Sequence, residues 1–263
     1  MRVIVTGAAG LIGSGVAERL ARDHAVIGVD LRPGPHVAIV GDCHDVALPE
    51  AEAIVHVAAL HAPDVGKRSE EEFRRVNVQA TARLLAHGAK HFVLTSTTSL
   101  YGHALHGWID ETVEPRPRDI YDVTKLEAEV LVREKGGAIL RMSRCFPEAA
   151  ALMTAYRLHR GVDRRDVAEA HALAIGRQGT WIVSAATPFR REDAAELAVD
   201  APAVIRRHHD LPWMPATIDR IYDSSLARGE LGWRPRYGVD ACLAGDWDPT
   251  PCRNAATPIS GTS

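Results

Sequence analysis

The stretch that decides the fold is T-G-A-A-G-L-I-G, at residues 6–13. It follows directly on the apolar run Val3-Ile4-Val5, which predicts a buried strand. Of its glycines, Gly7 permits a tight turn, Gly10 lets backbone N–H groups approach a pyrophosphate, and Gly13 lets a helix pack closely against the sheet. The spacing is G-x-x-G-x-x-G rather than the G-x-G-x-x-G of most dinucleotide-binding folds. We therefore expect a strand, a phosphate-binding turn and a helix at the start of the chain.

A carboxylate at the end of the second predicted strand indicates the same ligand. Ala25–Val29 is an apolar run, and Asp30 follows it, 20 residues after Gly10. At this distance an aspartate accepts hydrogen bonds from the adenosine ribose of a dinucleotide. An ordinary loop-opening aspartate is the alternative. Because a carboxylate repels a 2′-phosphate, Asp30 favours NAD over NADP, although Arg32 softens that preference by offering the phosphate a partner.

The composition excludes several classes of function. The 263 residues carry a formal net charge of −3, so the chain lacks the basic excess that binding to a nucleic-acid backbone requires. Four scattered cysteines without a C-x-x-C pair argue against disulfides and zinc, and thirteen dispersed histidines predict no metal site. No apolar run approaches the ~18 residues of a membrane span, and the first strand leaves no room for a signal peptide. We expect a cytoplasmic protein without nucleic-acid or membrane partners.

Short apolar runs alternate with longer amphipathic stretches in the first half of the chain. Strands are expected over 2–6, 25–30, 37–40, 53–58, 91–96 and 138–142, and helices over 11–22, 69–87 and 121–135. This alternation predicts an α/β fold of the Rossmann type, with a doubly wound parallel sheet whose ligands lie beyond the carboxyl ends of the strands. We assign residues 1–147 to an NAD-binding Rossmann domain that also carries the catalytic residues.

The pattern becomes irregular in the second half. Helices are plausible over 164–176 and 190–199, and a strand over 180–184. We assign residues 148–246 to a small, shortened C-terminal substrate-binding lobe interleaved with the last strands of the sheet. Residues 247–263, with several prolines and a Gly-Thr-Ser end, are expected to form a mobile tail.

Tyr121 and Lys125 form the first constellation with chemical meaning. Four residues apart on a predicted helix, they project from one face about a turn apart. An ammonium beside a phenol stabilises the phenolate and lowers its pKa from about 10, which suits Tyr121 to general acid/base catalysis. A surface pair on an ordinary amphipathic helix is the alternative.

A run of hydroxyl side chains favours the catalytic interpretation of Tyr121 and Lys125. Thr95-Ser96-Thr97-Thr98-Ser99 stands at the carboxyl end of the strand expected over 91–96, where a substrate would lie. Such hydroxyls can hold a substrate alcohol beside the Tyr121 phenol, although a Ser/Thr-rich turn also satisfies its own backbone.

These motifs together resemble the extended short-chain dehydrogenase/reductases, the NAD-dependent epimerase/dehydratase group. The resemblance covers residues 1–147 in the expected order. Its segments are T-G-A-A-G-L-I-G, Asp30, Gly41-Asp42, His56–Ala59, Asn77-Val78, Leu100-Tyr101-Gly102, Asp110-Glu111, Tyr121…Lys125 and Leu140-Arg141.

The resemblance implies specific roles. Thr97 would be the catalytic hydroxyl, Tyr121 would exchange the proton of the substrate hydroxyl, and Lys125 would bind the nicotinamide ribose. Asn77 would lie close to the site, although an asparagine on the polar face of a helix is nearly as plausible. The implied cofactor contacts are Gly7, Gly10, Leu11, Ile12, Gly13, Asp30, Leu31, Arg32, Asp42, Cys43, Val57, Ala58, Ala59, Asn77, Thr95, Tyr121, Lys125 and Phe146.

The residues after Thr97 bear on the reaction. Dehydratases of the group follow the catalytic threonine with Asp and Glu, whereas this chain has Thr98 and Ser99, and neither hydroxyl replaces a carboxylate as acid or base. Epimerisation needs only the Thr, Tyr and Lys set together with a retained cofactor. It therefore stays open beside net oxidation.

The length of the second half bears on the substrate. Only 16 residues separate Glu148 from Arg165, where nucleotide-sugar enzymes of the group usually have a much longer lobe. The segment around Arg144 is similar to that of uronate dehydrogenases, which oxidise a sugar acid at its anomeric carbon, although those enzymes have Asn-His where this chain has Thr98-Ser99. A substrate carboxylate would call for a bidentate arginine. The candidate substrate contacts are His61, Thr98, Arg144 and Arg157, with Arg160 as a further candidate.

Two hypotheses remain from the sequence. The first is an NAD-dependent oxidoreductase acting on a hydroxyl of a sugar, sugar acid or similar polyol, and the second is a sugar or nucleotide-sugar epimerase. A non-catalytic dinucleotide sensor is disfavoured, because such proteins typically lose the Tyr/Lys pair. The resemblance also implies a homodimer formed through the helices expected over 69–87 and 121–135.

Overall fold

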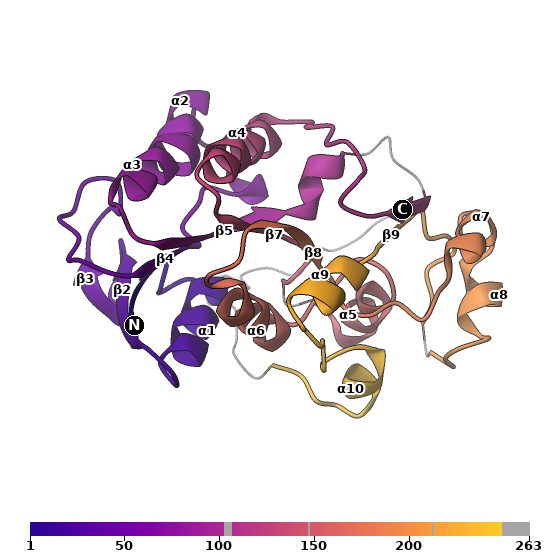
Figure 1. Cartoon of the computed structure of the whole chain (residues 1–263). Helices are drawn as coiled ribbons and strands as arrows, with labels where there is room; N and C mark the ends of the chain where they lie inside the picture. The colour runs from indigo at the N-terminus through magenta and orange to yellow at the C-terminus, as the bar shows by residue number, and fades with distance from the viewer. Residues whose placement is uncertain (103–106, 147, 212, 249–263) are drawn as a thin grey trace.

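A seven-stranded parallel sheet runs through the centre of the molecule (Figure 1). The computed structural model describes residues 1–102, 107–146, 148–211 and 213–248. Within this part the strand order is β3-β2-β1-β4-β5-β7-β8. The strands are β1 (Arg2–Thr6), β2 (Ala25–Asp30), β3 (Val37–Val40), β4 (Ala53–His56), β5 (His91–Thr97), β7 (Ala138–Met142) and β8 (Gly179–Val183). The order reverses between β1 and β4, which creates the switch point where such folds bind ligands.

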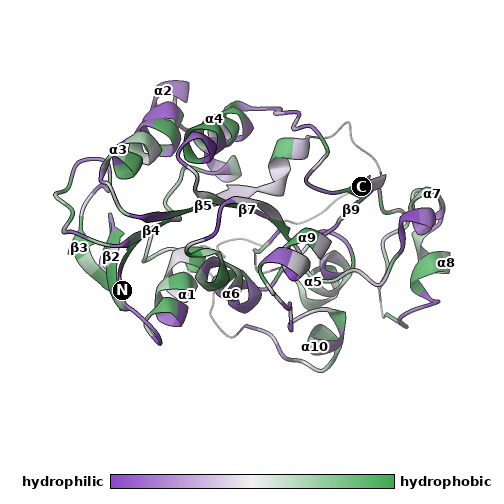
Figure 2. Cartoon of the chain, in the orientation of Figure 1, coloured by the Kyte–Doolittle hydropathy of each residue, from purple (hydrophilic) through white to green (hydrophobic). Residues whose placement is uncertain are grey.

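Helices cover both faces of the sheet, because each face of a buried parallel sheet is apolar. On one face lie α1 (Leu11–Leu20) and α6 (Arg164–Ala174), and on the other α2 (Glu70–Phe73), α3 (Ala80–Ala86) and α4 (Ile120–Glu134) (Figure 1). Helix α4 carries hydrophobic and hydrophilic residues on different sides (Figure 2). Each face has its own buried cluster, one around Val5, Val16 and Val167, the other around Ile54, Leu94 and Val132.

The second half of the chain adds a small lobe beyond β8. Strand β6 (Gly107–Ile109) pairs in parallel with β9 (Arg220–Tyr222), so this two-stranded sheet joins segments far apart in sequence. The helices are η4 (Arg191–Asp193), α5 (Ala150–Arg157), α7 (Ala194–Leu197), α8 (Ala201–Ile205), α9 (Ser225–Glu230) and α10 (Val239–Leu243). A separate apolar cluster that includes Leu158, Leu197 and Ile221 supports the lobe.

The sequence predictions agree closely with the structure in the first half. Strand β4 ends at His56, two residues before the predicted end, because the amides of Val57 and Ala58 turn to donate to the Thr6 hydroxyl at 3.1 and 3.2 Å. The helix expected over 190–199 is broken into η4 and α7, and β6 and β9 were not predicted. Of the predicted tail, Trp247 and Asp248 are described, and residues 249–263 lie outside the described residues, as does Pro147.

Among the described residues, no helix is both long and apolar enough to cross a membrane. Nor does this part of the chain bring three or more His, Cys, Asp or Glu side chains into a group able to hold a metal ion.

Buried histidines tie the layers of the fold together. Nδ1 of His171 lies 2.8 Å from the Val167 carbonyl, which can only accept, so this nitrogen carries the proton. Nε2 of His171 therefore accepts from the Thr95 hydroxyl at 2.7 Å, joining α6 to β5. Burial lowers the pKa of His171 to about 4, and burial lowers the pKa of His56 and His159 to about 3.

These histidines predict acid sensitivity. Between pH 6.5 and about 4 the unfolded chain binds protons that the folded chain does not, so stability falls as the pH falls through this window. Each histidine contributes a loss of up to about 1.4 kcal/mol per pH unit. Chemical denaturation between pH 7.5 and 5 measures the slope. The variant His171→Gln keeps an acceptor for Thr95 and should give a shallower slope; a slope equal to that of the wild type would contradict the assignment.

Candidate active site

The glycine-rich turn has the geometry that a phosphate-binding turn requires. Gly7 has a φ of +72°, and a Cβ there would lie 2.8 Å from the Ala58 nitrogen. A Cβ on Gly13 would lie 2.0 Å from the Gly7 carbonyl oxygen, so α1 can approach the turn only with glycine at this position. Side chains at these positions would displace α1 from the switch point.

The N-terminus of α1 fits a pyrophosphate. Gly10 caps the helix without a side chain, and the first turn contains no acidic residue. The backbone N–H groups of Leu11, Ile12 and Gly13 have no acceptor within the helix, and the helix dipole adds a partial positive charge beside them. A Cβ on Gly10 would meet only the Gly7 carbonyl, at 3.1 Å, which leaves the approach to these donors open. The residues present therefore fit the phosphates of a dinucleotide.

Asp30 closes the same turn from β2. Its Oδ2 accepts from the Ala9 amide at 2.9 Å, and its Oδ1 accepts from the Arg32 amide at 2.9 Å. Leu31 and Arg32 beside it are exposed. The carboxylate is thus fixed at the carboxyl end of β2, next to the glycine turn. Its contact with an adenosine ribose stays a prediction from the sequence.

Asp42 and Cys43 lie in the turn after β3. Asp42 accepts from the His44 amide at 2.9 Å and forms an ion pair with Arg75 at 2.9 Å. Cys43 is buried, and burial raises the pKa of its thiol to about 12. Both carboxylate oxygens of Asp42 thus have protein partners, and its contact with adenine stays a prediction.

Asn77 links the loop after β4 to α4. It lies in the π-helical segment η2 (Arg74–Gln79) between α2 and α3. Its Oδ1 accepts from the Leu60 amide at 2.9 Å, while its Nδ2 donates to the Leu60 carbonyl and to the Thr124 hydroxyl, both at 3.0 Å. The side chain therefore positions the loop that carries Val57, Ala58 and Ala59. Through Thr124, the residue before Lys125, it connects this loop to α4.

The structure places the three predicted catalytic residues at the carboxyl end of β5 and the start of α4. Thr97 ends β5, Tyr121 and Lys125 lie in the first turns of α4, and the Thr97 side chain is close enough to Tyr121 to lower the pKa of its phenol. The Thr97 hydroxyl also accepts from the Ser99 amide at 3.0 Å, which fixes its rotamer. Asp119 caps α4 by accepting from the Asp122 amide at 3.0 Å, so the helix begins where Tyr121 can face Thr97.

Burial dominates the ionisation of this group. It raises the pKa of Tyr121 to about 12, against the hydrogen bond from Thr97, which lowers it. It also lowers the pKa of Lys125 to about 8, against the charge of Glu129, which raises it. From the sequence we expected Lys125 to lower the phenol pKa. In the structure that pKa lies above its ordinary value, because desolvation outweighs the effect of Thr97 and the negative charges of Asp122 and Asp119 raise the pKa further.

A buried polar network that was not predicted from the sequence lies behind α4. Glu129 accepts from the Ser96 hydroxyl at 2.6 Å and pairs with Arg141 at 2.7 Å. Arg141 in turn donates to the Tyr101 hydroxyl at 2.9 Å. The signal was present in part, since Glu129 stands four residues after Lys125, the spacing that places both on one helix face.

Other side chains bind the hydroxyls of Thr95 and Ser99, and Thr98 is buried. The Thr95 side chain is engaged with His171, so only its backbone is available to a cofactor. Thr98 is buried, and its carbonyl accepts from the Tyr222 hydroxyl at 3.2 Å. The Ser99 hydroxyl accepts from Arg118, which is also held by Asp122 at 2.9 Å.

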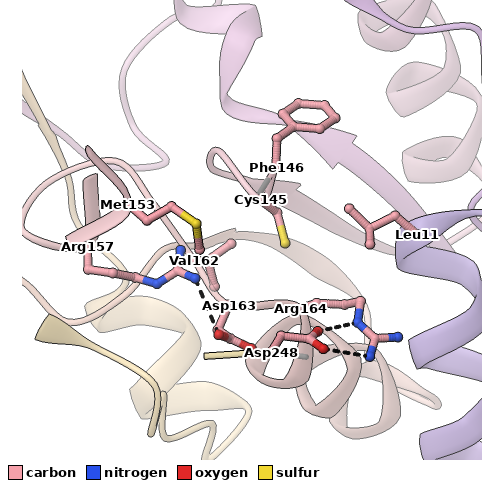
Figure 3. Close-up of a pocket in the computed structure, with 9 residues that line it drawn as sticks. All are labelled: Leu11, Cys145, Phe146, Met153, Arg157, Val162, Asp163, Arg164 and Asp248. Atoms are coloured by element: carbon pink, nitrogen blue, oxygen red, sulfur yellow. Dashed lines mark hydrogen bonds and ion pairs between the residues drawn. The ribbon is translucent and has the colours of Figure 1, made fainter. Parts of the chain in front are cut away.

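Of the predicted substrate contacts, Arg157 lines the pocket drawn in Figure 3, which Leu11, Cys145, Phe146, Met153, Val162, Asp163, Arg164 and Asp248 also border. Phe146 is half exposed and stacks on His61, with ring centroids 6.2 Å apart. Arg144 lies over the Phe146 ring at 5.8 Å and pairs with Glu148. Arg157 lines the pocket from α5, but it is buried and pairs with Asp163 at 3.3 Å. Arg144 is therefore more accessible to a ligand than Arg157.

Comparison with known proteins identifies the family. A sequence model described as the NAD dependent epimerase/dehydratase family matches residues 3–146. The chain belongs to this family. Its members are NAD-dependent enzymes of the extended short-chain dehydrogenase/reductase group, so the prediction of an NAD-dependent enzyme with this scaffold is confirmed.

Individual relatives are sugar-modifying enzymes by name. The chain is 33% identical over 163 residues to an uncharacterized UDP-glucose epimerase, YtcB, of Bacillus subtilis. This alignment covers 50% of this chain and 50% of the relative. It is 29% identical over 302 residues to a dTDP-glucose 4,6-dehydratase of Streptomyces antibioticus. This alignment covers 90% of this chain and 88% of the relative.

The fold also matches solved structures. The structure of MoeE5 in complex with UDP-glucose and NAD superposes with a TM-score of 0.70 at 24% identity, covering 93% of this chain and 96% of the other. UDP-glucose 4-epimerase of Thermotoga maritima superposes with a TM-score of 0.67 at 21% identity, covering 92% and 96%. The predicted Rossmann-type fold is confirmed.

The position of Asp30 predicts the cofactor preference. In the variant Asp30→Asn the charge that repels a 2′-phosphate is removed and the acceptor for the ribose is weakened, while Arg32 remains. The ratio of NAD to NADP affinity should fall by about 10-fold or more. Titration calorimetry with both dinucleotides measures it, with Asp200→Asn, a cap of α8 in the distant lobe, as control. An unchanged ratio in Asp30→Asn would rule out the ribose contact.

Proposed function

We propose that this protein is an NAD-dependent oxidoreductase that acts on a hydroxyl-bearing carbon of a sugar, sugar acid or similar polyol. The observation that carries the proposal is the placement of Thr97 at the end of β5 beside Tyr121 in the first turn of α4, with Lys125 one turn further along this helix. The pair stands at the carboxyl end of β5, on the same edge of the sheet as the glycine turn. A substrate hydroxyl bound there would meet a proton donor and acceptor beside the cofactor site.

The chain's own residues would supply the proton chemistry. Thr97, held by the Ser99 amide, would orient the substrate oxygen. Tyr121 would take the hydroxyl proton during oxidation and return it during reduction. Bound NAD would accept or donate the hydride at nicotinamide C4. The positive charge of Lys125 would stabilise the phenolate of Tyr121, offsetting the cost of burying it.

Net dehydration is disfavoured by the groups around Thr97. Positions 98 and 99 carry hydroxyls, Thr98 being buried and Ser99 bound to Arg118. Asp122, the acidic residue next to Tyr121, is buried and paired with the same arginine. These groups offer no carboxylate acid and base for eliminating water at this point of the site.

A compact substrate is supported by the lengths of the relatives. The alignment with the dehydratase spans 302 positions and that with a UDP-glucose 4-epimerase of Streptococcus mutans 325, both more than the 263 residues of this chain. The relatives therefore have residues without a counterpart here. Together with the accessible Arg144 beside Phe146, this favours a small substrate that carries a carboxylate.

Epimerisation is the second candidate, because two of these relatives are named UDP-glucose epimerases. The two functions differ in the balance of electrons. Incubation with sugars, sugar acids and nucleotide sugars in the presence of NAD should give one NADH per turnover for an oxidoreductase. Conversion of a sugar to its epimer without net NADH over many turnovers would show the epimerase instead. Absorbance of the reduced nicotinamide and chromatography of the sugars measure both.

Tyr121 is the residue on which the proposal depends most. The variant Tyr121→Phe should lose at least about 100-fold in kcat on the identified substrate, because a positioned general acid/base contributes that much or more. Its NAD affinity and Tm should change little, since the ring remains. Tyr237→Phe is the matched control: its ring lies under Arg165 in the second lobe and should leave kcat unchanged. Full activity of Tyr121→Phe would refute the catalytic assignment.

A further inference from the structure

The C-terminal segment places a carboxylate in the pocket beside the dinucleotide turn. Asp248 forms a two-pronged ion pair with Arg164, with Oδ2 2.5 Å from Nε and Oδ1 3.1 Å from Nη2 (Figure 3). Both side chains are nearly buried, at 12% and 13% exposed. Both also line the pocket that Leu11 and Phe146 border. The pair thus joins the end of the described chain to the cofactor side of the molecule.

Arg164 lies directly against α1. A Cβ on Gly15 would come within 2.9 Å of its Nη1 and 3.2 Å of its Cγ, so the absence of a side chain on the helix makes room for the arginine. Leu11, the first residue of α1, shares the pocket with it. The guanidinium is therefore close to the helix N-terminus whose N–H groups fit a pyrophosphate. Its charge adds to the partial charge of that terminus.

We propose that Arg164 contributes to the positive potential that binds the dinucleotide pyrophosphate, and that Asp248 is an internal counter-ion that reduces this potential and weakens dinucleotide binding. The pyrophosphate and the Asp248 carboxylate are both anions, and both are stabilised by the same guanidinium. In a pocket this poorly solvated, charges a few ångströms apart are weakly screened. The inference depends on the family's NAD site and is independent of the reaction proposed above.

A second ion pair provides a matched control. Asp246 pairs with Arg165 at 2.7 Å, two residues before Asp248, and fastens the same segment to the start of α6. Neither of these two residues borders the pocket. If the segment acted only as a mechanical fastener, the two aspartates would have equivalent effects.

The test compares the affinity of the full chain for NAD in three variants. Asp248→Asn keeps the shape and removes the charge, and should tighten NAD binding by about 5- to 20-fold at low salt. The gain should shrink in 0.5 M salt, extend to ADP, which carries the pyrophosphate, and be absent for adenosine. Asp248→Glu should bind like the wild type, and Asp246→Asn should stay within about twofold of it. Isothermal titration calorimetry gives the constants.

The proposal would be overturned if Asp248→Asn bound NAD with unchanged or weaker affinity. It would also be overturned if Asp246→Asn gained as much affinity for NAD as Asp248→Asn. An equal gain for adenosine would exclude an effect on the pyrophosphate. Thermal unfolding of each variant verifies that the protein is folded, and Asp248→Ser replaces the asparagine variant if that one does not fold. Because binding is measured without turnover, failure of the proposed reaction would leave these outcomes untouched.

Discussion

The close approach of α1 to the glycine turn is the constraint on which the rest of the site depends. With glycine at positions 7 and 13 the first helical N–H groups stand directly above the point where the sheet order reverses. Any side chain at position 13 would collide with the Gly7 carbonyl, so this geometry requires glycine. The Asp30 carboxylate lies against the same turn, and α6 packs on α1, where Gly15 leaves space for Arg164. Cofactor binding and core packing thus share one local geometry.

Polar contacts between elements hold α4 and the loop after β4 in place relative to this turn. Thr6 bonds the amides after β4, and Asn77 fastens the following loop to α4. Behind α4, the ion pair of Glu129 with Arg141 ties the helix to β7. Each of these groups is buried and has a partner, so displacing one leaves a desolvated polar atom. The loops at the carboxyl edge are consequently held in one arrangement without any covalent link.

The second lobe modifies this common scaffold. Its two-stranded sheet joins residues more than a hundred positions apart, and its own apolar cluster keeps it folded beside β8. Through α5 and the segment ending at Asp248 it contributes charged groups to a pocket that the Rossmann part borders with Leu11 and Phe146. Residues of both parts of the chain therefore line one pocket where the two parts contact each other.

The sequence by itself determined the sheet, the helices of the first half, the glycine turn and the Tyr121 and Lys125 pair, because these depend on local periodicity and short-range spacing. The role of Thr97 was implied by the family resemblance. Only the tertiary structure decided which hydroxyls remain available: it commits Thr95 to His171 and raises the pKa of Tyr121. It also decided that Arg157 is paired and that Asp248 reaches Arg164. Burial and pairing across many residues leave no local pattern in the sequence, so these features emerge only when the chain is folded.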